Sequence, residues 1–143
     1  MHEPLGIGHC SLHEFRLVND IRGNLSVGEF ARDIPFSPKR CFLIFNVPNG
    51  EVRGVHAHKI CHQFLVCIRS SCQVLLDDRR HRRELTLDRV NLGVYVPAMI
   101  WGTQQTFSSD AMLLVFASEY YDRNDYIENY DDFRALVAKA PGE

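Results

Sequence analysis

Short segments in which apolar and polar residues alternate recur along most of the chain, separated by residues that favour turns. The turn signals come at intervals of roughly 8–12 residues, which is typical of an all-β sandwich or barrel. Pro48-Asn49-Gly50 and Ser108-Ser109-Asp110 are two of these turns, built from residue types that suit turn geometry. The pattern predicts strands at Cys10–Leu17, Leu25–Glu29, Arg40–Val47, Val52–His58, Gln63–Arg69, Gln73–Asp77, Arg83–Thr86, Leu92–Val96, Ile100–Phe107 and Ala111–Ala117.

The C-terminal segment has a different periodicity. Between Asp125 and Val137 the apolar side chains fall at helical intervals, which predicts one short helix that caps the β structure. The chain shows no internal repeat and no linker. Its 143 residues and 45% hydrophobic content fit a single domain of common size, covering residues 1–143.

Charge and composition exclude several functions. A net charge of −2 argues against a general nucleic-acid surface, which is usually strongly basic. The basic run Arg79-Arg80-His81-Arg82-Arg83 is flanked by acidic residues, which favours a solvated hairpin loop over a phosphate site. The apolar runs are too short to span a bilayer and the N-terminus lacks a signal-peptide pattern. Five cysteines without Cys-x-x-Cys spacing favour reduced thiols, so we expect a cytoplasmic protein with no membrane partner.

Two histidines separated by one residue are the clearest chemical feature. On an extended strand, His56 and His58 point to the same face. A β-barrel metal site built on a His-x-His pair also needs a downstream carboxylate and a later histidine as ligands. In this chain Gln63 and Trp101 occupy those two positions. The pattern favours imidazole acid/base chemistry without a metal or other cofactor. The simpler alternative is a pair of hydrogen-bonded strand histidines with no catalytic role.

Cationic residues near the histidines could stabilise an oxyanion. Strict alternation puts Arg53 and Lys59 on the face opposite the histidines, so Arg53 can join them only through a bend, which Gly54 allows. Arg22 and Arg53 together could hold a diphosphate through the bidentate geometry of guanidinium. Gln63 fits a polar lining residue or a surface residue at a strand start. Trp101 could stack on a base or sugar, although a core position is at least as consistent with its type.

Five separated sequence motifs carry a resemblance to a known enzyme family. They are Asp20-Ile21-Arg22-Gly23, Ile34-Pro35-Phe36-Ser37-Pro38-Lys39-Arg40, Arg53-Gly54-Val55-His56-Ala57-His58-Lys59, Phe107-Ser108-Ser109-Asp110 and Tyr121-Asp122-Arg123-Asn124-Asp125-Tyr126-Ile127. In this order they resemble the dTDP-sugar 3,4-ketoisomerases, over a stretch from about Phe15 to Phe133. The resemblance is far more specific than the histidine pair alone.

The resemblance implies a metal-independent cupin with a jelly-roll β-barrel, usually a homodimer. It implies conversion of dTDP-4-keto-6-deoxyglucose to its 3-keto isomer, for deoxysugars of surface glycans such as O-antigen or lipopolysaccharide. In this family His56 and His58 would be the catalytic pair, and Arg53 would belong to the site for the dTDP-linked keto-deoxysugar.

Two departures from the family pattern bear on the chemistry. The strand after Lys39-Arg40 usually contains tyrosines but here reads Cys41-Phe42-Leu43-Ile44-Phe45, so a hydroxyl at the site is lost. Gly102 follows Trp101 where some members have a larger polar residue, which leaves the stereochemistry at C4 open.

The hypothesis is therefore a ketoisomerase in which one of His56 and His58 takes the C3 proton. The other histidine, or a water that it orients, protonates C4. Two alternatives stay open at this point: a dTDP-sugar epimerase, which returns the proton to the same carbon, and a non-catalytic cupin that binds a sugar nucleotide. A metal-dependent dioxygenase is disfavoured by Gln63 and Trp101.

Overall fold

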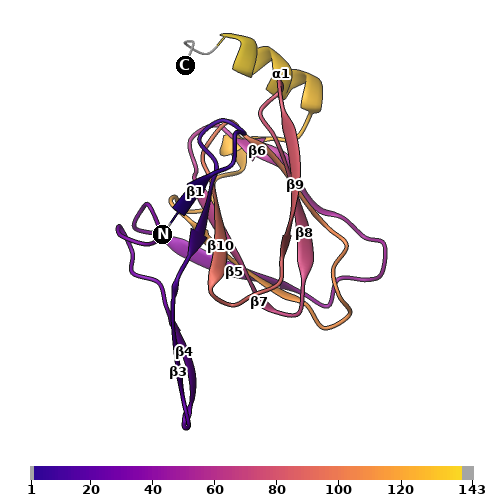
Figure 1. The fold of residues 1–143 in the computed structure, drawn as a ribbon. Coiled ribbons are helices and arrows are strands. Elements are labelled where there is room, and N and C mark those ends of the chain that lie inside the picture. Colours follow the sequence, from indigo (N-terminus) through magenta and orange to yellow (C-terminus); the bar gives the residue numbers. More distant parts are fainter. Residues whose placement is uncertain (1, 140–143) are drawn as a thin grey trace.

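Two antiparallel sheets packed face to face form the body of the molecule in the computed structural model, which describes residues 2–139 (Figure 1). The six-stranded sheet has the order β1-β2-β10-β7-β12-β5. Its strands are β1 (His2–Pro4), β2 (Ser11–Glu14), β10 (Leu92–Val96), β7 (Gln63–Arg69), β12 (Met112–Ala117) and β5 (Arg40–Phe45). The five-stranded sheet has the order β13-β6-β11-β8-β9. Its strands are β13 (Tyr126–Ile127), β6 (Arg53–His58), β11 (Trp101–Gln105), β8 (Cys72–Asp77) and β9 (Arg82–Leu87).

The main core lies between these sheets, because alternate side chains of each strand point inward. Val74 and Leu76 of β8 and Leu113 of β12 are completely buried there. A second buried cluster contains Phe15, Ile34, Phe64 and Val66. Gly93 of β10 allows close packing there, since a Cβ at this position would lie 2.1 Å from the ring of Phe64. The predicted all-β jelly roll is confirmed, although the two sheets stay separate within residues 2–139 instead of closing into one hydrogen-bonded barrel.

A two-stranded hairpin, β3 (Arg16–Asp20) and β4 (Gly23–Val27), projects beyond the two sheets (Figure 1). The sequence predicted one strand over Cys10–Leu17, which was wrong because the chain leaves the large sheet at Phe15. The side chain of Phe15 is buried, and its N–H donates to the carbonyl of Asn91 at 2.7 Å. The chain therefore changes direction between β2 and β3.

The C-terminal helix α1 (Tyr130–Lys139) begins five residues later than predicted. Arg123–Asp125 form a 3₁₀ turn, η1, and β13 pairs with β6, so this segment is held in non-helical contacts. Asn129 precedes the helix and accepts a hydrogen bond from the N–H of Asp132 at 3.0 Å, which caps the N-terminus. Within residues 2–139, no helix has the length and apolar character needed to cross a membrane.

Candidate active site

A β-bulge in β6 determines which side chains face the space between the sheets. The pairing of β6 with β11 shifts by one residue around Val55. Gly54 and Val55 both have positive φ, 78° and 61°. The extra residue reverses the alternation, so Arg53 reaches the same face as His56. In this register His56 pairs with Gly102, Gly54 with Thr103 and Arg53 with Gln104. Gly102 and Gln104 are two residues apart on β11, so their partners His56 and Arg53 share a face.

His56 and His58 are in direct contact at the end of β6. Their Nε2 atoms are 3.2 Å apart, and the rings meet edge to face with centroids 4.9 Å apart. Nδ1 of His58 lies 3.0 Å from the carboxylate of Asp125. Because an ionised carboxylate can only accept, Nδ1 of His58 donates, and in the neutral ring Nε2 is the acceptor that faces His56.

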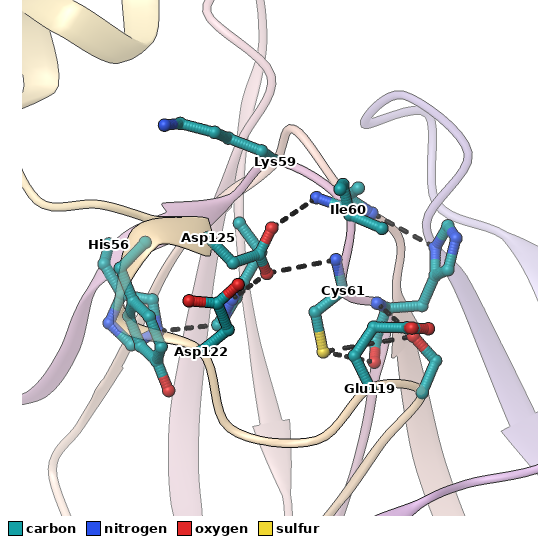
Figure 2. Close-up of polar contacts among 12 residues, drawn as sticks. His56, Lys59, Ile60, Cys61, Glu119, Asp122 and Asp125 are labelled. Carbon is teal, nitrogen blue, oxygen red and sulfur yellow. Dashed lines mark hydrogen bonds and ion pairs between the residues drawn. The ribbon is translucent and has the colours of Figure 1, made fainter.

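Asp125 is fixed by backbone groups as well as by His58 (Figure 2). Its two carboxylate oxygens accept from the N–H of Ile60 at 2.7 Å and of Cys61 at 3.2 Å. Burial alone would raise the pKa of Asp125, but these amides and His58 hold that pKa below its usual value. Asp125 therefore stays ionised at neutral pH, and it sets both the tautomer and the orientation of His58.

Both histidines are neutral at pH 7. Burial lowers the pKa of His56 below its usual value. Burial and the neighbouring His56 lower the pKa of His58 to about 4, although Asp125 acts in the opposite direction. A neutral imidazole carries the lone pair that proton abstraction requires, so the pair has the protonation state of a general base.

His56 lines a cavity that is large enough for a small molecule. It measures about 480 Å³, within the range of ligand sites of roughly 300–1,000 Å³. Polar groups on its wall come from both sheets: Arg53, His56, Gln63, Gln104, Tyr126 and Glu128. Apolar side chains of β5 and β12 complete it: Phe42, Ile44 and Val115. A narrower pocket beside it is lined by both histidines, Cys61 and Gln63.

The structure thus brings together His56, His58, Arg53 and Gln63 from the predicted set, and places the other three elsewhere. The ammonium of Lys59 points away from Asp125 and donates to the carbonyl of Asn124 at 3.1 Å (Figure 2). Trp101 is buried on the face of the five-stranded sheet opposite His56. Its ring centroid lies 5.6 Å from that of Phe133 in α1. Arg22 lies at the turn of the projecting hairpin, paired with Asp20 at 2.6 Å.

Besides Asp125, the predicted set of site residues lacks Tyr126 and Arg40. The ring of Tyr126 lies 4.8 Å from that of His56 and 4.4 Å from that of His58, measured between centroids. A guanidinium nitrogen of Arg40 lies 3.5 Å from the hydroxyl of Tyr126. Both residues belong to the sequence motifs that carry the family resemblance. Those motifs were the only feature of the sequence that could have placed Arg40 and Tyr126 at the site.

Within residues 2–139, one group of side chains has the composition of a metal site. His58, Cys61 and Asp125 offer ligand atoms within 4.8 Å of one another. The carboxylate of Asp125, however, already accepts hydrogen bonds from His58 and two backbone amides. The arrangement fits a hydrogen-bonded histidine better than a ligand set, and the absence of a metal requirement stays a prediction.

The two packed antiparallel sheets have the cupin fold. The epimerase NovW of Streptomyces spheroides, a 4-keto-6-deoxy sugar epimerase, shares the fold, with a TM-score of 0.76 and 22% identity over 88% of this chain and 71% of its own. The family model described as "FdtA: WxcM-like, C-terminal" matches residues 8–138. The chain belongs to this family.

Two proteins named for 3,4-isomerase activity are similar to most of the chain. The TDP-4-oxo-6-deoxy-alpha-D-glucose-3,4-oxoisomerase of Aneurinibacillus thermoaerophilus is 46% identical over 125 residues, which cover 87% of this chain and 90% of that protein. A variant of the 3,4-ketoisomerase QdtA from Thermoanaerobacterium thermosaccharolyticum, in complex with TDP-4-keto-6-deoxyglucose, has a TM-score of 0.89 and 34% identity, covering 93% of this chain and 96% of its own.

Proposed function

We propose that this protein is a 3,4-ketoisomerase that moves the ketone of dTDP-4-keto-6-deoxyglucose from C4 to C3. One observation carries the proposal: two neutral histidines are in contact, with Nε2 atoms 3.2 Å apart, and one of them, His56, lines the cavity. The 46% identical oxoisomerase and the QdtA complex supply the substrate class.

The reaction needs two proton transfers at neighbouring carbons. One of His56 and His58 removes the C3 proton, and the electrons of that bond form an enediolate with its charge on the C4 oxygen. The other histidine, or a water that it orients, delivers a proton to C4. The proton of the C3 hydroxyl is transferred to the C4 oxygen, which leaves a ketone at C3 and a hydroxyl at C4. Contact between the two Nε2 atoms allows the pair to share and return the proton.

Arg53 and Gln63 are the proposed substrate-binding residues in this cavity. Both line it together with His56. A guanidinium presents paired N–H groups that match phosphate oxygens, so Arg53 suits the diphosphate of the sugar nucleotide. The amide of Gln63 can donate to and accept from sugar hydroxyls. Lys59 and Trp101, predicted as binding residues, are omitted from this proposal because neither lines the cavity.

We also propose that the protein is a homodimer. The hairpin β3–β4 exposes Leu17, Ile21 and Leu25, and the edge strand β5 exposes Leu43 and Phe45. Apolar side chains on a projecting hairpin and on an unpaired sheet edge suit association with a second copy. Arg22 lies in the turn between β3 and β4, and this hairpin projects beyond the two sheets (Figure 1). In this proposal Arg22 serves as a binding residue only for a partner's site.

The five cysteines support a reducing, cytoplasmic location, since all five are free thiols. The glycan that receives the product, such as O-antigen or lipopolysaccharide, stays a prediction from the family.

The test is product analysis. Purified protein is incubated with dTDP-4-keto-6-deoxyglucose, and the position of the ketone is determined by NMR. We expect a 3-keto product. A product that keeps the C4 ketone with an inverted neighbouring carbon would identify an epimerase, and nucleotide binding without turnover would identify a non-catalytic cupin. Either outcome would overturn the proposal.

A further inference from the structure

We propose that Tyr126 is a further catalytic residue, whose hydroxyl donates a hydrogen bond to the substrate oxygen that becomes negatively charged on enolisation. The inference rests on the proposed isomerase function and adds a donor to it. The family comparison led us to expect a hydroxyl from the strand after Arg40, where this chain has Phe42. Phe42 does line the cavity, so β5 presents an apolar wall at this position.

Tyr126 is held beside the histidines by backbone pairing. It lies in β13, directly opposite His58 in the antiparallel register with β6. Opposed residues of such a pair project to the same side of the sheet. The tyrosine ring accordingly packs on both histidine rings, with centroids 4.8 Å and 4.4 Å away. Among the described residues that line the 480 Å³ cavity, Tyr126 is the only one with a phenol.

Arg40 orients the phenol so that its proton is available. Guanidinium nitrogens only donate, so at 3.5 Å the phenol oxygen of Tyr126 accepts from Arg40. The O–H of Tyr126 is then directed to a different acceptor. The positive charge of Arg40 also strengthens the phenol as a donor, because it stabilises negative charge that accumulates on the phenol oxygen.

Arg40 is itself firmly positioned. Its Nε donates to the carbonyl of Glu119 at 3.1 Å. Its guanidinium lies over the rings of Phe42 and Tyr121, 5.5 Å and 5.6 Å from their centroids. A cation held between two aromatic faces and a carbonyl keeps one geometry, and preorganised donors of this kind stabilise developing charge most effectively.

The chemistry assigns the phenol and the histidines different tasks. The neutral histidines accept and return carbon-bound protons, while the enediolate oxygen needs a donor that stays in place throughout. Tyr126 keeps its proton in this scheme, so no atom is transferred to or from it. Removal of one such donor costs about 100-fold or more in kcat, because its hydrogen bond is strongest when the oxygen is charged.

The test is the substitution Tyr126→Phe, which removes one oxygen and keeps the ring that packs on the histidines. We expect kcat to fall about 100-fold, with KM and the affinity for dTDP within threefold of wild type and an unchanged melting temperature. The matched control is Tyr120→Phe, the same change on a tyrosine that is 72% exposed and does not line the cavity. It should keep wild-type kcat.

Three results would overturn the inference in an active wild-type enzyme. They are a Tyr126→Phe variant whose kcat stays within threefold of wild type, a loss confined to KM, and an equal loss of kcat in Tyr120→Phe. A fall in kcat accompanied by loss of dTDP binding or of folding would assign Tyr126 a structural role instead. Wild-type protein that binds dTDP without converting the keto sugar would overturn the proposed function itself, and this inference with it.

Discussion

At the scale of single residues, the chemistry of His58 depends on Asp125. One carboxylate oxygen, Oδ2, accepts from both His58 Nδ1 and the N–H of Cys61, and the other accepts from the N–H of Ile60. Every group around this carboxylate is a donor. An asparagine at this position must therefore turn its NH₂ toward at least one of them, which breaks a contact that fixes either the loop or the histidine.

We therefore expect Asp125→Asn to lower kcat by about 100-fold or more through misorientation of His58 and its tautomer. Asp125 raises the pKa of His58, so its loss should lower that pKa further. An active histidine base is deprotonated, so the acidic limb of the kcat/KM profile should move to lower pH. A pH–rate series measures both effects.

Asp122→Asn is the control for this experiment. Asp122 is exposed and accepts from the N–H of Asn124 at 3.0 Å at the start of η1, a capping role that asparagine performs equally well. It should retain wild-type kinetics. Equal activity of the Asp125 and Asp122 variants would contradict the role assigned to Asp125.

The histidine pair was predictable from local spacing alone, because two residues of one strand share a face. Asp125, Tyr126 and Arg40 were not, because their roles arise from contacts across 67 to 86 residues of sequence. The pattern assigned Asp125 and Tyr126 to a helix. Pairing of β13 with β6 places them at the site instead.

At the scale of elements, the bulge in β6 is what adds Arg53 to the site. The sequence allowed a bend at Gly54 but could not specify it, since the bulge is defined by its register with β11. A Cβ on Gly54 would lie 2.9 Å from the side chain of Gln104 and 3.1 Å from the carbonyl of Gly102. Its φ of +78° also disfavours any side chain.

Gly54→Ala should therefore lower stability and displace Arg53 from the cavity. We expect destabilisation of about 1–3 kcal/mol in denaturant unfolding and a severalfold increase in KM. Gly50→Ala is the matched control, because Gly50 has a similar φ of +83° but no atom within 4 Å of an added Cβ. Gly50→Ala should lower the stability through backbone strain but should keep the wild-type KM. Identical KM values for the two variants would show that the bulge does not position Arg53.

At the scale of the whole molecule, alternation along the chain was enough to predict an all-β sandwich or barrel, and the family resemblance specified the jelly roll. The order of strands in each sheet was not predictable, because neighbours such as β5 and β12 are distant in sequence. The projecting hairpin was also missed, since its apolar residues resemble core positions in the pattern. They are exposed in the chain, with Leu25 at 58%.

The proposed dimer makes these exposed side chains an interface. Light scattering should give twice the chain mass of 16.5 kDa. Leu25→Asp places a charge on the hairpin and should shift the protein toward the monomer. Val90→Asp, at a position 48% exposed outside the hairpin and β5, should leave the mass unchanged. A monomeric wild-type protein, or equal effects of both substitutions, would contradict this interface.

The most direct test of the whole account is the fate of solvent deuterium in the reaction. Wild-type protein in deuterated water should convert dTDP-4-keto-6-deoxyglucose to the 3-keto sugar with deuterium at C4, as seen by NMR. His56→Asn or His58→Asn should abolish this labelling in at least one case. A substrate whose ketone stays at C4, or full activity in both variants, would contradict proton transfer by the histidine pair.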